Sequence, residues 1–537
     1  MSLIEHLPPE IYSAILSHVS FPLLQTTTLA FSCALPRSPI PQYHVFQYVR
    51  LTHPEQIIQL YQRLRKDRNL ITNIDAFSLE TWTADADVVV NLMNLLSSGR
   101  IKELRMFVGP NFAPEHLEDI FEKPWHGLQF LSLRFRPYVQ RATYYQFLKG
   151  AYFDSTLLAL SRWSKGSCPL PSLSIIQDAL DATIAPTGRF AQPLVFFRLD
   201  PFRTLSYSPL TSELEHFRLR IPSRQVARFI YSVANSFPAL EFLDLSTCNV
   251  VESDVEAILG RFGKLKHLVL DGCSVVSQRS DLAEEERQNL WALLGKSMAL
   301  AGVKLAKERE KKLKVWLEAN VLRASMNALQ VADAGPAAPP VPVQRRPRRG
   351  RRGLATATIS LRESLPPDAE PLPGLPSRHT GPPVALSTQK IRILPPQPLL
   401  RTFATTAPGY HKTVKDKDTQ HSSIRGQFER GWAEGVAQLS AIRGRLLRSW
   451  QGGMRVVAFR HHHLSTLYDE DNESGDGSSE EIGLQGLVDV HTAEEFVVEE
   501  ALCPVLCLAG SGKKGAAEGH VEGCGHVVGW NVWEDEL

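Results

Sequence analysis

Two stretches, LEFLDLSTC at residues 240–248 and LKHLVLDGC at residues 265–273, decide the expected fold. They start 25 residues apart, share one order of leucines and end in Cys248 and Cys273. The second and third leucines of each stretch are two residues apart, so both side chains point to one face of a short strand. The first leucine lies just before the strand and can join the same interior. Each stretch predicts a strand, and residues 254–262 between them predict a helix.

Looser copies of this pattern occur earlier in the chain, and they begin at Ile71, Ile101, Leu128, Leu170, Leu194 and Leu214. A unit of 20–30 residues cannot bury a core of its own, so neighbouring units must stack. Stacking predicts a curved solenoid over residues 70–280, with a parallel sheet inside and helices outside. An ordinary α/β domain with leucine-rich strands is the alternative.

The pattern resembles the leucine-rich-repeat family, and the copies at 240 and 265 resemble its cysteine-containing type. The resemblance implies an α/β fold class: a leucine-rich-repeat-like solenoid with a short all-α F-box-like N-terminal module and a disordered C-terminal region. Cys248 and Cys273 are then structural residues rather than metal ligands or nucleophiles.

The N-terminal stretch LPPEIYSAILSHV predicts a short helix, because Pro9 and Glu10 suit a first helical turn. The stretch resembles the start of an F-box, and residues 4–330 resemble fungal proteins in which F-box-like segments precede leucine-rich repeats. The resemblance implies that residues 4–45 bind a Skp-type adaptor protein. By this resemblance, the adaptor-binding residues are Leu7, Pro8, Ile11, Ile15, Leu16, Leu23 and Leu24. A plain helix start is the alternative, since Pro-Glu is common there. The family's later Cys-Arg-x-Trp element is absent from this sequence.

The remaining chain divides by composition. Residues 281–330 are rich in Ala, Leu, Lys and Glu and predict a helical cap. Residues 334–420 predict a disordered Pro/Arg-rich linker, since residues 336–400 hold 15 of the 36 prolines. Residues 421–460 contain a possible helix, and residues 461–537 predict a mostly disordered tail.

Charge and cysteine content favour an intracellular protein, nuclear or cytoplasmic. The formal net charge is +2, and the seven cysteines are scattered and odd in number, unlike a disulfide framework. No signal peptide or membrane span is expected. The stretch RRPRRGRR contains a candidate nuclear-import signal, with nucleic-acid contact or a charged linker as alternatives. Its arginines are Arg345, Arg346, Arg348, Arg349, Arg351 and Arg352.

The sequence predicts no catalytic residues, no cofactor and no metal, and hence no enzyme. GSGKKG at residues 510–515 lacks the spacing of a phosphate-binding loop. A metal site is the alternative for five C-terminal residues, but their spacing is unlike the usual paired-cysteine zinc patterns, and the Gly-rich surroundings suggest no scaffold. These residues are Cys503, Cys507, His520, Cys524 and His526.

In a solenoid, the strand residues between the inward leucines point to the concave face. The arginines at these positions form a candidate target-binding set, since arginine binds carboxylate or phosphate with paired hydrogen bonds. They are Arg105, Arg134, Arg198, Arg218 and Arg220. Their target is expected to be acidic or phosphorylated, and a merely solvated face is the alternative.

Together these patterns predict the substrate-recognition subunit of a Skp–cullin–F-box ubiquitin ligase. The N-terminal helices would bind the adaptor, and the repeats would bind a protein target. Two other hypotheses remain: a leucine-rich-repeat interaction scaffold without a ligase role, and an arginine-rich nuclear protein that contacts RNA.

Overall fold

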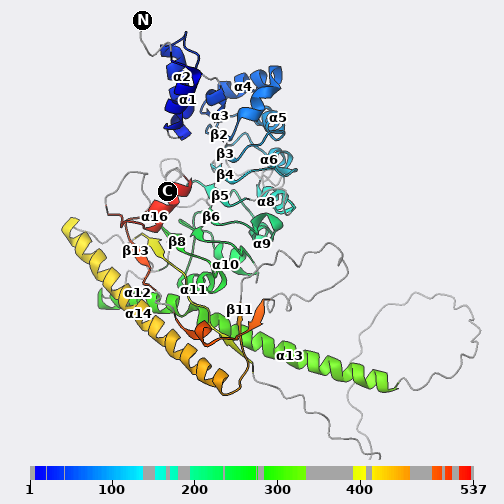
Figure 1. Ribbon diagram of the computed structural model, residues 1–537, viewed down its shortest axis with the longest axis vertical. Coiled ribbons are helices and arrows are strands. Elements are labelled where there is room, and N and C mark those ends of the chain that lie inside the picture. Colours follow the sequence, from blue (N-terminus) through cyan, green and yellow to red (C-terminus); the bar gives the residue numbers. More distant parts are fainter. Residues whose placement is uncertain are drawn as a thin grey trace, which may run out of the picture. The chain divides into compact units, whose positions relative to one another are not determined.

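The chain forms an α/β fold in the computed structural model, built around a ten-stranded parallel sheet (Figure 1). The structure describes residues 7–19, 21–40, 43–136, 152–164, 170–179, 194–233, 236–273, 275, 284–333, 391–406, 414–459, 486–498, 502–510 and 519–533. Contacts within the chain define two units, Met1–Leu313 with Ile391–Leu537, and Lys314–Lys390.

The strands of the main sheet are parallel, and their spatial order follows the order of the chain. They are β1 (Tyr48–Leu51), β2 (Ala76–Leu79), β3 (Glu103–Val108), β4 (Phe130–Phe135), β5 (Ser172–Gln177), β6 (His216–Arg220), β7 (Phe242–Asp244), β8 (His267–Leu270), β10 (Thr402–Thr405) and β13 (Val505–Cys507).

Helices connect the first eight strands, because a parallel crossover needs a connection long enough to return to the same end of the sheet. These helices cover one face of the sheet. They are α4 (Pro54–Lys66), α5 (Ala86–Leu96), α6 (Pro114–Phe121), α8 (Asp154–Ser161), α9 (Asp200–Ser206), α10 (Ala227–Tyr231) and α11 (Glu252–Arg261). Short 3-10 helices occur at Arg68–Asn73 and Pro209–Thr211.

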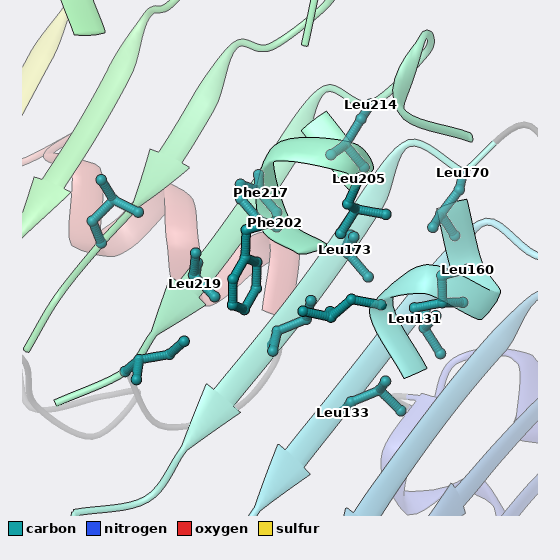
Figure 2. Packing of buried hydrophobic residues seen from close by; sticks show 14 of the residues in the cluster. Leu131, Leu133, Leu160, Leu170, Leu173, Phe202, Leu205, Leu214, Phe217 and Leu219 are labelled. Atoms are coloured by element: carbon teal, nitrogen blue, oxygen red, sulfur yellow. The ribbon is translucent and has the colours of Figure 1, made fainter. Parts of the chain in front are cut away.

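The core lies between these helices and the sheet. The strand leucines point toward the helices, as Figure 2 shows for Leu131, Leu173 and Leu219 beside residues of α8 and α9. The leucine that precedes each strand joins this core, as expected: Leu128 and Leu214 are fully buried. The apolar residues of the sequence pattern, which are spaced three and two residues apart, therefore lie on the helix-covered face of the sheet.

The N- and C-terminal segments add further elements. The first described helices are α1 (Pro9–Ser17), α2 (Phe21–Ala34) and α3 (Tyr43–Gln47), which precede β1. After β8 come α12 (Glu284–Ala299), α13 (Ala301–Asp333) and α14 (Val414–Gln451), and α12 packs along α14. A three-stranded sheet has the order β12 (Leu487–Asp489), β11 (Val456–Phe459), β9 (Arg392–Leu394). A 3-10 helix at Ala493–Phe496 and α16 (Gly525–Trp533) complete the described elements.

The expected leucine-rich-repeat solenoid with an all-α N-terminal module and a disordered C-terminal region is wrong. The chain forms an α/β fold with a ten-stranded all-parallel central sheet and helices between the strands. The sheet begins with β1 from the N-terminal part and ends with β10 and β13 from the C-terminal part. Strands β2 and β5 are buried at every position, which is typical of a parallel sheet covered on both faces rather than of an open concave one.

Two expectations about order in the C-terminal half are also corrected. The segment 334–420, expected to be a disordered linker, contains β9, β10 and the first turns of α14. The segment 461–537, expected to be a mostly disordered tail, contributes β13 to the main sheet and α16 to its surface.

The pattern copy at Leu194 forms no strand. Asp154 of α8 accepts hydrogen bonds from the backbone N–H groups of Phe197 and Arg198, both at 2.9 Å. These two donors are therefore not available to a neighbouring strand, and β5 pairs directly with β6.

Cys248 and Cys273 are buried and act as hydrogen-bonding residues of the core. The Cys248 thiol donates to the Leu219 carbonyl at 3.3 Å, and the Cys273 thiol donates to the Leu245 carbonyl at 3.2 Å. Burial raises the pKa of Cys248 to about 12 and also raises the pKa of Cys273. Both thiols stay protonated, which agrees with the structural role expected for them.

Candidate functional site

The N-terminal helices leave several apolar side chains exposed. Leu16, Tyr12 and Leu24 are buried, with 0%, 1% and 5% of their surface exposed. Ile11 and Ile15 of α1 are 44% and 41% exposed. On α2, Leu23 is 56% and Leu29 is 46% exposed.

The seven predicted adaptor residues therefore divide into three groups by exposure. Leu16 and Leu24 hold the helices in place. Leu7 is half-buried, and the other four, Pro8, Ile11, Ile15 and Leu23, are exposed. The four exposed residues Ile11, Ile15, Leu23 and Leu29 are together called the N-terminal apolar surface.

Polar contacts attach these helices to the first strand. Ser13 of α1 and Tyr43 of α3 share a hydrogen bond between hydroxyl groups at 3.1 Å. The side chain of Gln25 donates to the Val45 carbonyl at 3.3 Å and accepts from the Arg50 backbone N–H at 3.1 Å. The N-terminal apolar surface is thus held by an edge of the main sheet.

Four of the five predicted target-binding arginines lie on the face of the sheet opposite the connecting helices. Arg134 forms an ion pair with Asp178 at 2.7 Å, and Arg220 forms one with the fully buried Asp244 at 2.6 Å. Arg218 donates to Ser174 at 2.8 Å and has no exposed surface.

Helix α16 covers part of this second face (Figure 1). The Arg218 guanidinium carbon lies 4.6 Å from the centre of the Trp533 ring, and Arg105 donates to the Trp533 carbonyl at 3.1 Å. The Trp533 ring also contacts Phe130 of β4 and Phe242 of β7, with centroids 5.6 Å and 6.5 Å apart. The arginines expected to form an open recognition surface are therefore engaged by the chain's own residues.

Arg198 is separate from that face and exposed. It borders a groove between α6, α8 and α9, whose lining includes Glu115, Tyr152, Phe197 and Asp200. Phe197 is 44% exposed and stacks on Tyr152, with ring centroids 5.1 Å apart. The sequence pattern missed this aromatic pair, because it assigned Phe197 to the interior of a strand.

The structure brings together four of the five C-terminal cysteine and histidine residues. The ligand atoms of Cys507, His520, Cys524 and His526 all lie within 4.8 Å of one another, whereas Cys503 lies outside this cluster. The expectation that these residues lack a scaffold is wrong, because β13 and α16 position them.

Short-range contacts change the acidity of the cluster. A hydrogen bond with Cys507 lowers the pKa of Cys524 to about 6 and raises that of Cys507. Burial lowers the pKa of His526, but hydrogen bonds to Asp271 and Cys507 outweigh it and raise the pKa to about 9. These contacts favour the deprotonated form of Cys524 and the protonated form of His526.

Comparison of the sequence with models of protein families and with curated proteins finds no match. Among the helices of the described segments, none is both long and apolar enough to cross a bilayer. The candidate nuclear-import arginines, Arg345 to Arg352, lie outside the described residues.

Proposed function

We propose that this chain is the substrate-recognition subunit of a Skp–cullin–F-box ubiquitin ligase. The observation that supports the proposal most directly is the N-terminal apolar surface. Ile11 and Ile15 are four residues apart, so they lie on one side of α1, and both are exposed although Leu16 beside them is buried. A short amphipathic helix with exposed apolar residues is a common element of protein recognition.

Burial by a partner would be favourable at these positions. Fully burying an isoleucine or leucine side chain contributes about 1.5–3 kcal/mol. The N-terminal apolar surface offers four such side chains, each 41–56% exposed. Burial of these exposed portions in an apolar groove of the adaptor would therefore favour binding.

The target would bind elsewhere on the same chain. The groove combines the exposed Phe197, stacked on the half-buried Tyr152, with the exposed Arg198. Aromatic residues and arginine are the residues that most often dominate interfaces. The subunit would then act by proximity, since holding the target near the ubiquitin-carrying enzyme raises its local concentration.

The proposal is tested by binding of the purified full chain to a purified Skp-type adaptor. The double variant Ile11→Asp/Ile15→Asp should weaken capture by at least about tenfold, because each aspartate places a charge in the apolar contact. Ile58→Asp is the matched control, since Ile58 of α4 is also 44% exposed and lies outside the N-terminal apolar surface.

Two results would contradict the proposal. The first is failure of the unmutated chain to bind the adaptor. The second is equal loss of binding in the Ile58→Asp control, which would show that the aspartates act nonspecifically. An interaction scaffold without a ligase role is the second candidate function, favoured by the exposed Phe197 in the groove. The first result would be compatible with it.

A further inference from the structure

The four clustered cysteine and histidine side chains come from two elements on the second face of the sheet. Cys507 is the last residue of β13, beside Ala404 of β10. His520 and Cys524 precede α16, and His526 lies in its first turn. Cys507, Cys524 and His526 have no exposed surface, and His520 is half-buried.

Two glycines place these residues. Gly523 has a φ of 68°, a left-handed conformation that favours glycine and turns the chain into α16. A Cβ atom at Gly525 would lie 3.0 Å from the Thr402 hydroxyl oxygen and 3.2 Å from a methyl carbon of Val269. The start of α16 can therefore approach β8 and β10 closely, which brings Cys524 and His526 to Cys507.

The distances within the cluster fit the edges of a metal tetrahedron. His520 Nδ1 lies 3.7 Å from Cys507 Sγ and 3.8 Å from Cys524 Sγ, and His526 Nδ1 lies 3.9 Å from Cys524 Sγ. Zinc–sulfur bonds of about 2.3 Å and zinc–nitrogen bonds of about 2.0–2.1 Å give sulfur–nitrogen edges of about 3.6 Å. Small side-chain shifts are enough to reach this geometry.

A buried carboxylate orients one of the histidines. Nε2 of His526 lies 2.7 Å from Oδ2 of Asp271, and Asp271 is 2% exposed. The other oxygen of Asp271 accepts a hydrogen bond from Thr406 at 3.3 Å. With Nε2 engaged, Nδ1 of His526 faces Cys524, and metal-binding histidines commonly have such a carboxylate partner.

We propose that Cys507, His520, Cys524 and His526 bind one zinc ion. Two thiolates and two imidazoles form a soft donor set that suits zinc, and four protein ligands close the coordination shell. The site is therefore structural rather than catalytic. It joins β13 to α16, which has nine residues and is too short to be stable alone.

Zinc binding holds α16 over the arginines of the second face. Trp530 and Trp533 of α16 pack with Phe130 of β4, and Trp533 lies over Arg218. Without the metal, the start of α16 loses its link to β13. Zinc binding would therefore add to the Trp530 and Trp533 contacts that hold α16 on the second face.

The proposal is tested on the purified full chain by elemental analysis and by cobalt substitution. After dialysis against metal-free buffer, about one zinc ion per chain is expected. Replacing zinc with Co²⁺ should give thiolate charge-transfer bands and the visible bands of tetrahedral cobalt. Cys524→Ser should lose the bound zinc, and Asp271→Asn should weaken zinc affinity by about 10–100-fold.

Cys503→Ser is the matched control, because Cys503 is in the same segment but outside the cluster. It should keep the full zinc content. His526→Cys keeps four ligands and should also retain zinc, so it separates loss of a ligand from loss of folding.

Three results would overturn the proposal. One is an unmutated chain without zinc that shows no thiolate–cobalt band when Co²⁺ is added. Another is a Cys507–Cys524 disulfide in protein isolated under reducing conditions. The third is zinc loss in Cys503→Ser equal to that in Cys524→Ser.

Discussion

The two faces of the main sheet are buried by different means. On the helix-covered face, leucines such as Leu104, Leu131 and Leu243 form one apolar core with helices that are adjacent in sequence. On the second face, the same strands carry serine, arginine, histidine and aspartate, and α16 approaches from the far end of the chain.

The apolar contacts of one face and the polar contacts of the other differ in how specifically they select a partner. Apolar contacts have no direction, so any well-packed helix can cover leucines. A buried polar group must find a partner of matching chemistry, since leaving it unpaired costs about 1–3 kcal/mol. Here these partners are distant in sequence: Arg105 meets Trp533 across 428 residues, and Asp271 meets His526 across 255 residues.

Asp244→Ala should give the largest effect on the second face. Asp244 is fully buried, pairs with Arg220 at 2.6 Å and accepts from the Ser246 backbone N–H at 2.9 Å. Removing one member of a buried ion pair leaves an uncompensated charge, so the free energy of unfolding should fall by about 3–5 kcal/mol. Urea denaturation followed by circular dichroism measures it.

Two further variants sharpen this prediction. Leu243→Ala changes the neighbouring residue, which points to the helix-covered face, and should cost about 2–5 kcal/mol by leaving a cavity. The double variant Asp244→Ala/Arg220→Met removes both charges and should be more stable than Asp244→Ala. A double variant that is less stable would show that the unpaired charge is not the cause.

Acid should weaken the second face selectively through His267. Burial, with Arg401 and Lys266 nearby, lowers the pKa of His267 from about 6.5 to about 4. Protonation of His267 is therefore disfavoured in the folded state. The contribution of neutral His267 to the free energy of unfolding is fully present above about pH 6.5 and is lost as the pH falls toward about 4. His267→Gln, which can still bond to Thr402, should have a shallower loss of stability over this range.

This prediction is checked by urea midpoints of both proteins at several pH values. Comparing the two proteins cancels effects of acid on the cysteine and histidine cluster, which both contain. Identical pH dependence in the two would mean that His267 titrates normally in the folded protein.

Arg198→Glu should give the smallest effect. Arg198 is exposed and lies away from the second face, so its substitution should change the free energy of unfolding by no more than about 0.5 kcal/mol. The measurement is thermal unfolding beside the unmutated chain. A loss above about 1 kcal/mol would show that the Arg198 side chain helps to hold the loop before α9.

The leucine pattern predicted the core well because it reports local geometry. Residues two apart on a strand must share a face, and Leu268 and Leu270 are both buried as expected. The pattern failed at Phe197, where a single carboxylate from α8 takes the backbone donors of a strand-like stretch. The spacing of apolar residues gives no indication of such a competing hydrogen bond.

The C-terminal half was predicted less well for a related reason. Strands β10 and β13 are only four and three residues long. Strand β10 pairs with β8 on one side and with β13 on the other. This pairing uses backbone atoms, which every residue carries, so the side-chain pattern does not predict it. The donor set Cys507, His520, Cys524 and His526 was visible as residue types, but its irregular spacing did not match a known pattern.

The sequence by itself determined which residues form the helix-covered core, because amphipathic spacing is a property of neighbouring residues. It also determined the apolar character of the first helix. Only the tertiary structure decided that α16 covers the arginines, that Asp271 orients His526 and that Ile11 and Ile15 stay exposed while Leu16 does not. These features depend on contacts between segments tens to hundreds of residues apart, and such contacts exist only once the chain has folded.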